Sequence, residues 1–92
     1  LLMMQIDCER LKELTAAMTP ISEMAVLLDI PESLLREELA DPNSQAYSVY
    51  RRAKAEVSLL MRVELIKMAK AGAPTAITEL QKMNAKLAAD EP

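Results

Sequence analysis

The chain has 92 residues, of which 51% are hydrophobic and 2% aromatic, with no histidine and a formal net charge of −3. No apolar run approaches the roughly 20 residues of a membrane-spanning helix, and the lone Cys8 excludes an internal disulfide, so we expect a cytoplasmic protein without a membrane partner. The abundance of Leu, Ala, Met, Glu and Lys, with a single Gly and no Phe or Trp, predicts an all-α fold.

The first predicted helix covers residues 5–17. Its apolar residues Cys8, Leu11, Leu14 and Met18 recur at intervals of three and four positions. That spacing places them on one side of a helix and predicts a single buried stripe.

Two shorter helices are predicted next. One covers residues 20–28, with Thr19 as its N-cap. The other begins near Pro31, after a tight turn, and ends before the stop signal Asp41-Pro42-Asn43. Two short helices joined in this way are typical of a helix-turn-helix, which commonly places its second helix in the major groove of DNA.

A long helix is predicted over residues 45–71, with Ser44 as N-cap and Gly72 at its end. A shorter final helix begins at Pro74. The complete expectation is therefore an N-terminal three-helix unit containing the helix-turn-helix, followed by a long helix and a shorter C-terminal helix.

The long helix has apolar residues on two opposite sides. One side is expected to close over the three-helix unit, and the other requires the final helix or a second subunit as cover. We therefore predict a homo-oligomer. Its expected interface residues on the last two helices are Leu59, Val63, Ile66, Leu80, Met83 and Leu87.

Charge divides unevenly between the two predicted parts of the domain. Residues 1–43, the helix-turn-helix unit, contain nine acidic and three basic residues, a net charge of −6. Residues 44–92, the long and final helices, contain eight basic and five acidic residues, a net charge of +3. Such asymmetry bears on the choice of partner rather than on the fold.

Five side chains are candidate contacts to double-stranded DNA. Arg51, Arg52 and Lys54 can neutralise backbone phosphates, or they can form an ordinary solvated face with local ion pairs. Ser33 and Arg36 lie in the first turns of the predicted recognition helix, where Arg36 can donate two hydrogen bonds to a guanine.

Acidic residues oppose this interpretation of the recognition helix. Glu32, Glu37 and Glu38 lie on the same helix, where a glutamate can accept from cytosine or can simply face water. Glu37, Glu38 and Asp41 do not predict a metal site, because adjacent carboxylates on a helix point in different directions. With no histidine, phosphate-binding glycine loop or activated nucleophile, we expect no catalytic residues, no cofactor and no enzymatic activity.

Several features of the sequence occur together in one known family. They are the spacing Ala25, Ile30, Leu35, Leu39, the run Tyr47-x-x-Tyr50-Arg51-Arg52-Ala53-Lys54-Ala55-Glu56, the residues Leu60, Leu65 and Ala69, and the turn Gly72-Ala73-Pro74-Thr75-Ala76-Ile77. Together they resemble the helix-turn-helix proteins related to bacteriophage terminase small subunits, found in phages and prophages. The similarity covers residues 20–80, and its most specific part is the turn into the last helix.

The resemblance implies an oligomeric, ring-forming protein that recognises phage DNA and delivers it to a packaging motor, the large terminase subunit. It would make Ser33 and Arg36 the helix-turn-helix contacts and place the last two helices at the assembly surfaces. Asp29 stands where a Gly often closes the family's turn, and Asp can adopt the left-handed conformation needed there. Two alternatives remain: a stand-alone regulator, and a helical protein-interaction module that keeps this shape without binding DNA.

Overall fold

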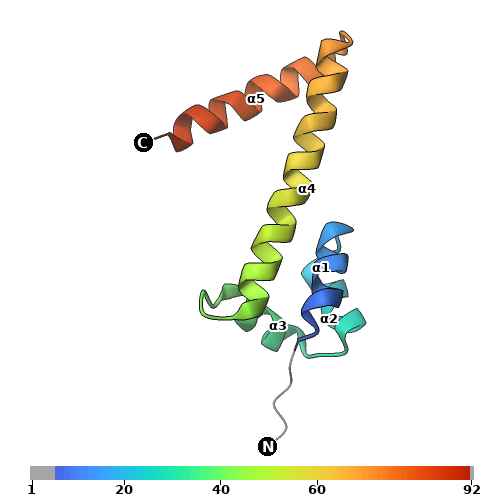
Figure 1. The fold of residues 1–92 in the computed structure, drawn as a ribbon, viewed down its shortest axis with the longest axis vertical. Helices are drawn as coiled ribbons and strands as arrows, with labels where there is room; N and C mark the ends of the chain where they lie inside the picture. Colours follow the sequence, from blue (N-terminus) through green and yellow to red (C-terminus); the bar gives the residue numbers. More distant parts are fainter. Residues whose placement is uncertain (1–5, 92) are drawn as a thin grey trace, which may run out of the picture. The chain divides into compact units, whose positions relative to one another are not determined.

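The computed structural model describes residues 6–91, which form five α-helices and no strand (Figure 1). The expected all-α fold is confirmed, including a long fourth helix and a shorter final one. The helices are α1 (Cys8–Ala16), α2 (Ile21–Leu28), α3 (Glu32–Ala40), α4 (Gln45–Lys70) and α5 (Pro74–Asp90).

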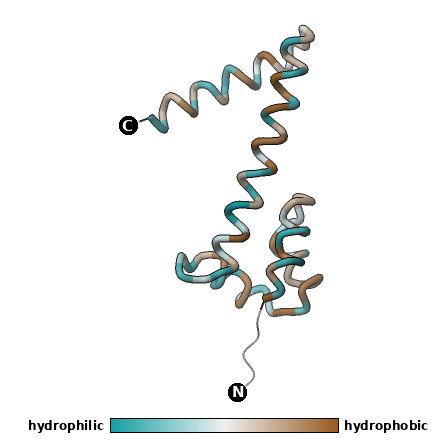
Figure 2. Tube along the Cα trace, viewed as in Figure 1, coloured by the Kyte–Doolittle hydropathy of each residue, from teal (hydrophilic) through white to brown (hydrophobic). Residues whose placement is uncertain are grey.

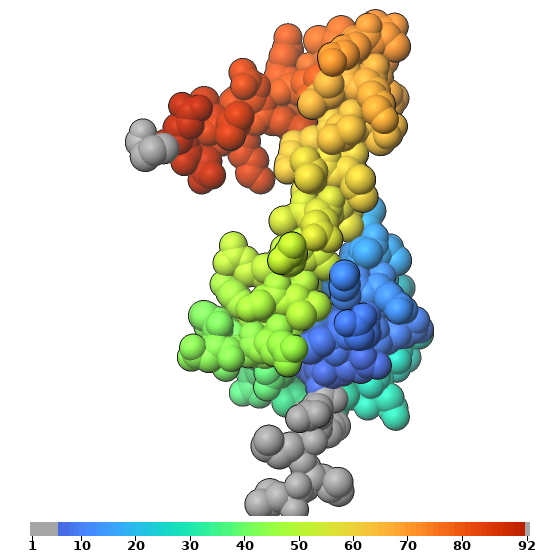
Figure 3. All heavy atoms as spheres, viewed as in Figure 1, coloured from blue at the N-terminus to red at the C-terminus, as the bar shows by residue number. Residues whose placement is uncertain are grey.

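The chain divides into two compact units, Leu1–Val57 and Ser58–Pro92. The first unit contains α1, α2, α3 and the beginning of α4. In the space-filling view its blue, teal and green atoms pack closely together (Figure 3). The helix-turn-helix therefore shares one core with the start of the long helix, which lies against it.

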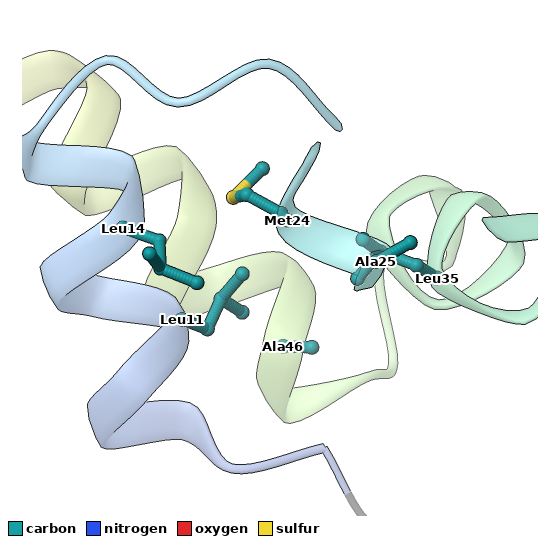
Figure 4. Packing of buried hydrophobic residues seen from close by; sticks show 6 residues of the cluster. All are labelled: Leu11, Leu14, Met24, Ala25, Leu35 and Ala46. Atoms are coloured by element: carbon teal, nitrogen blue, oxygen red, sulfur yellow. The ribbon is translucent and has the colours of Figure 1, made fainter. Parts of the chain in front are cut away.

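The core of the first unit is small and draws on all four helical segments. Leu11, Met24 and Leu35 are its largest fully buried side chains, one each from α1, α2 and α3. The residues that converge there are Leu11, Leu14, Met24, Ala25, Leu35 and Ala46 (Figure 4). Ala46 supplies the α4 surface, where a small side chain lets the helix approach closely. Tyr50 and Val49 pack around the edge.

The first helix begins later than predicted. Its N-cap is Asp7, whose side-chain oxygen accepts a hydrogen bond from the Arg10 backbone N–H at 3.1 Å. Ile6 and Asp7 therefore precede the helix, and the expected start at Gln5 lies outside the described residues. The N–H groups of the first turn have no partner within the helix, and an aspartate that accepts from one of them sets where the helix begins. The apolar spacing does not mark this position.

The connection from α1 to α2 corrects two further expectations. Met18 is 65% exposed with φ of 60°, because α1 ends at Ala16 and Met18 has left the helical face. Thr19 is not the N-cap of α2: Pro20 occupies that position, with no side-chain cap bond. Pro20 instead contributes its carbonyl, which accepts from the Met24 N–H at 2.9 Å.

The turn between α2 and α3 depends on Asp29. Its φ of 56° and ψ of 46° are left-handed, as expected for the position that closes the turn. The Asp29 N–H donates to the Val26 carbonyl and the Ile30 N–H to the Ala25 carbonyl, each at 3.1 Å. These bonds satisfy carbonyls at the end of α2 and turn Ile30 back towards the core, against which it packs.

A pair of substitutions tests this turn. Asp29→Ala is expected to destabilise the protein by roughly 1 kcal/mol, because alanine lacks the local hydrogen-bonding that helps aspartate adopt a left-handed conformation. Asp29→Gly should be at least as stable as Asp29→Ala, because glycine has no Cβ to clash. Urea denaturation of the three proteins measures the order, and an alanine variant as stable as the parent would contradict it.

The start of α4 and the break between α4 and α5 agree with the sequence. Ser44 Oγ accepts from the Ala46 backbone N–H at 3.2 Å at the start of α4. Gly72, with φ of 94°, follows the end of α4, and α5 begins at Pro74. The left-handed glycine and the proline two residues later separate the two helices.

The second unit has almost no core of its own. Within residues 58–91, Ala76 is the one buried residue, at 2% exposure. Apolar positions along this half of α4 are visible as brown segments in Figure 2. The large exposed apolar side chains in this unit are Leu59, Leu60, Met61, Val63, Ile66, Met68, Ile77 and Leu87.

Candidate nucleic-acid and assembly surfaces

The beginning of α4 carries a face on which each cation lies over a tyrosine of the preceding turn. The Arg51 guanidinium lies 5.4 Å from the centre of the Tyr47 ring, and its Nη1 donates to the Tyr47 hydroxyl at 2.7 Å. One turn further, Lys54 Nζ lies 5.2 Å from the centre of the Tyr50 ring. Both cations are exposed. We call Tyr47, Tyr50, Arg51 and Lys54 the cation–tyrosine face.

This arrangement holds positive charge in place without neutralising it. A tyrosine ring attracts a cation through its electron-rich face but carries no net charge. Because the Tyr47 hydroxyl accepts from Arg51, its own proton stays available for an incoming oxygen. The face therefore offers two cations and a hydroxyl donor, which suit a phosphate.

Arg52 has a different environment from its neighbour. Its Nε donates to Glu56 Oε1 at 3.3 Å in an exposed ion pair. Adjacent residues on a helix do not share a face, whereas residues three apart do. The three predicted phosphate contacts thus separate: Arg51 and Lys54 lie together, and Arg52 lies apart with a carboxylate partner.

The two candidate contacts on α3 are exposed, but the cation is already engaged. Arg36 Nε donates to Glu32 Oε2 at 2.9 Å, one turn earlier on the same helix. Ser33 lies on the exposed side of the first turn. To bind a guanine, Arg36 has to give up this ion pair within a helix that also carries the exposed Glu37.

An open groove between α2 and the start of α3 was not anticipated from the sequence. It has a volume of about 390 Å³ and is lined by Ser22, Ala25, Val26, Asp29, Ile30, Pro31 and Glu32. Val26 is 78% exposed, although the sequence places it in an apolar helix. We call this the α2–α3 groove. The sequence feature that could have indicated this groove is Val26 itself. It is apolar but directly follows the buried Ala25, and adjacent residues on a helix do not point to the same side.

A second, larger groove lies within the second unit, between the last part of α4 and α5. We call these two helical segments the hairpin, and the groove between them the hairpin groove. Its volume is about 1000 Å³, and it includes Met61, Ile66, Leu80, Met83 and Leu87. Of the six expected interface residues, the four on this apolar lining are Ile66, Leu80, Met83 and Leu87. Leu59 and Val63 do not line it, although both side chains are exposed.

Other reactive groups do not gather into a site. Burial, followed by the negative charges of Asp7 and Glu9, raises the pKa of the half-buried Cys8 thiol and disfavours its nucleophilic thiolate form. Across residues 6–91, no three acidic or cysteine side chains are grouped so that they could hold a metal ion. Helices long and apolar enough to cross a membrane are likewise absent from the part of the chain that the structure describes.

The fold defines a class: an all-helical protein with a helix-turn-helix unit, a cation–tyrosine face beside it and an uncovered apolar hairpin. Comparison of the chain with protein-family models, curated proteins and solved structures gives no match. Any functional assignment therefore depends on the surfaces described above.

Proposed function

We propose that the chain is an oligomeric DNA-binding protein of the helix-turn-helix type found in phages and prophages, related to terminase small subunits. Its role would be in DNA packaging, with a large terminase-type motor subunit as partner, or in related regulation. The observation that carries this proposal is the cation–tyrosine face, which lies on the helix directly following the helix-turn-helix.

Phosphate contact is the chemistry this face supports best. Arg51 and Lys54 are exposed, lie on one face three residues apart, and have no carboxylate partner among the ion pairs of the described residues. Cations on DNA-binding proteins gain affinity by releasing the counterions condensed on the phosphates. In this proposal α4 supplies most of the affinity for DNA, while Ser33 and Arg36 lie near the edge of the DNA major groove.

Assembly is the second part of the proposal. Residues 58–91 bury only Ala76, so they remove too little apolar surface from water to offset the entropy of ordering two helices. We propose that copies of the chain cover the hairpin groove for one another. An oligomer would also multiply weak DNA contacts, since linked sites bind with a higher effective concentration.

Salt titration of duplex binding tests the DNA part. For the full-length protein, affinity should fall steeply with salt, and Arg51→Ala/Lys54→Ala should flatten the slope of log K against log[salt] by about 0.9 for each phosphate that is no longer neutralised. Arg52→Ala/Lys67→Ala is the matched control, because it removes the same two charges from cations of α4 that are already paired with Glu56 and Glu64. Fluorescence anisotropy with a labelled duplex measures all three proteins.

Two results would count against this function. One is no detectable binding at about 50 mM salt, where electrostatic attraction is strong. The other is an equal loss of affinity in the control and in Arg51→Ala/Lys54→Ala, which would reflect overall charge rather than this face.

A specific observation favours a second candidate, a helical protein-interaction module that keeps the helix-turn-helix shape without DNA. The cation of α3 is bound by Glu32, and the adjoining groove exposes an apolar Val26 beside Asp29. A surface of this kind repels phosphates and fits a protein better. Absence of DNA binding together with concentration-dependent association would favour this candidate.

A further inference from the structure

The α2–α3 groove combines exposed apolar surface with negative charge. Ala25, Val26, Ile30 and Pro31 form its apolar lining. Asp29 and Glu32 place carboxylates along the same groove. Phosphate is the wrong ligand for such a surface, whereas a cationic partner with an apolar body matches both of its properties.

A partner of that chemistry is present on the chain itself. The cation–tyrosine face offers two cations together with two tyrosine rings, which can bury apolar area while the charges meet carboxylates. Within one copy, the ion pairs of the described residues do not join this face to the groove: Glu32 pairs with Arg36, and Arg51 contacts Tyr47. The complementary surface is therefore free to come from another copy.

We propose that the α2–α3 groove docks the cation–tyrosine face of a second copy of the chain. The contact is heterologous, because one patch meets a different patch, and such contacts generate rings or open filaments. It goes beyond the hairpin contact, since it uses the first unit alone. It also makes neighbouring copies competitors of DNA, because Arg51 and Lys54 serve both.

Disulfide trapping in the full chain tests the contact. In a Cys8→Ser background, one protein carries Val26→Cys in the groove, and the other carries Ala55→Cys, an exposed position one turn after Arg51. Oxidation of the mixture should give a cross-linked heterodimer. The control mixture pairs Val26→Cys with Glu9→Cys, an exposed position on α1, and should give little product.

Charge neutralisation supplies the second arm. Adding Asp29→Asn/Glu32→Gln to the groove-bearing copy should lower the cross-linking yield about fivefold, the effect expected from losing the exposed ion pair of Asp29 and the weaker one of Glu32, which also binds Arg36. Asparagine also tolerates the left-handed conformation at position 29, so the turn should survive. High salt should also lower the cross-linking yield. Equal cross-linking yields in the two mixtures would overturn the proposal. So would a yield that neither the two substitutions nor high salt lower.

DNA binding is read out separately, so the two proposals fail independently. If both hold, duplex DNA should suppress the cross-link, and Asp29→Asn/Glu32→Gln should strengthen DNA binding at protein concentrations where copies associate. A specific cross-link without any DNA affinity supports the docking and removes the DNA function. Salt-dependent DNA binding without the cross-link removes the docking alone.

Discussion

Leu35→Ala is expected to lower the free energy of unfolding of the helix-turn-helix unit by about 2–5 kcal/mol, the usual cost of truncating a buried leucine. Leu35 is 0% exposed and packs from α3 into a core with two other large, fully buried side chains. A total stability of roughly 5–15 kcal/mol is typical for a domain, so the variant should be largely unfolded at moderate urea.

Tyrosine fluorescence makes this measurement specific to the first unit, because the chain's two tyrosines, Tyr47 and Tyr50, both lie within it and Tyr50 packs against the core. Leu27→Ala is the matched control: it is the same truncation, made at a side chain 51% exposed. That variant should change stability by no more than about 1 kcal/mol. Similar destabilisation in both variants would mean that Leu35 is not the centre of the core.

The helices were predictable because each has both a periodic apolar pattern and a stop signal. Gly72 and Pro74 mark the break between α4 and α5 in the sequence, and the structure follows them. At α1 the pattern was misleading, because periodicity extends past the true ends. Asp7 fixes the start by capping, and Met18 continues the spacing of the stripe although the chain has already turned away.

The candidate site was predictable in its residue types but not in its pairings. Arg36, Arg51 and Arg52 are the same residue type, yet the partners that they contact one turn away differ in charge. Arg36 meets Glu32 and Arg52 meets Glu56, whereas Arg51 meets the uncharged Tyr47. Inspection of positions four residues apart contains this distinction in principle. Which of two exposed partners a long side chain takes is decided by rotamer and packing, which the spacing alone does not specify.

The α2–α3 groove shows a limit of another kind. Met24 and Ala25 lie in the core, but the apolar pattern of α2 does not say whether the next apolar residue is covered. Val26 is exposed and is not among the described residues that pack against the core. An apolar residue on a short helix that the neighbouring helices leave uncovered therefore indicates an interaction surface, but it can be recognised only once those neighbours are known.

Leu87→Glu is expected to dissociate the oligomer into chains of 10.2 kDa, if copies cover the hairpin groove for one another. Leu87 lines that groove and is 60% exposed in the single chain, so its replacement should leave the helices of the free chain intact. In the assembly it would place an unpaired carboxylate against apolar surface. Burial of an unpaired charge costs several kcal/mol, which corresponds to a weakening of association by about 100-fold or more.

Ile77→Glu provides the matched control on the same helix, because Ile77 is also exposed, at 42%, but does not line the groove. Sedimentation velocity at micromolar concentrations is carried out at high salt, which weakens the ionic docking at the α2–α3 groove. It should show the parent and the control as oligomers and Leu87→Glu as a single chain, with equal helix content by circular dichroism. A monomeric parent would remove the assembly proposal altogether, and dissociation by both substitutions would move the contact to another face of α5. The hairpin groove and the cation–tyrosine face lie in different units, so the dissociated variant should keep the contacts of each single chain to DNA. It should still bind DNA more weakly than the parent, because the avidity supplied by linked copies is absent.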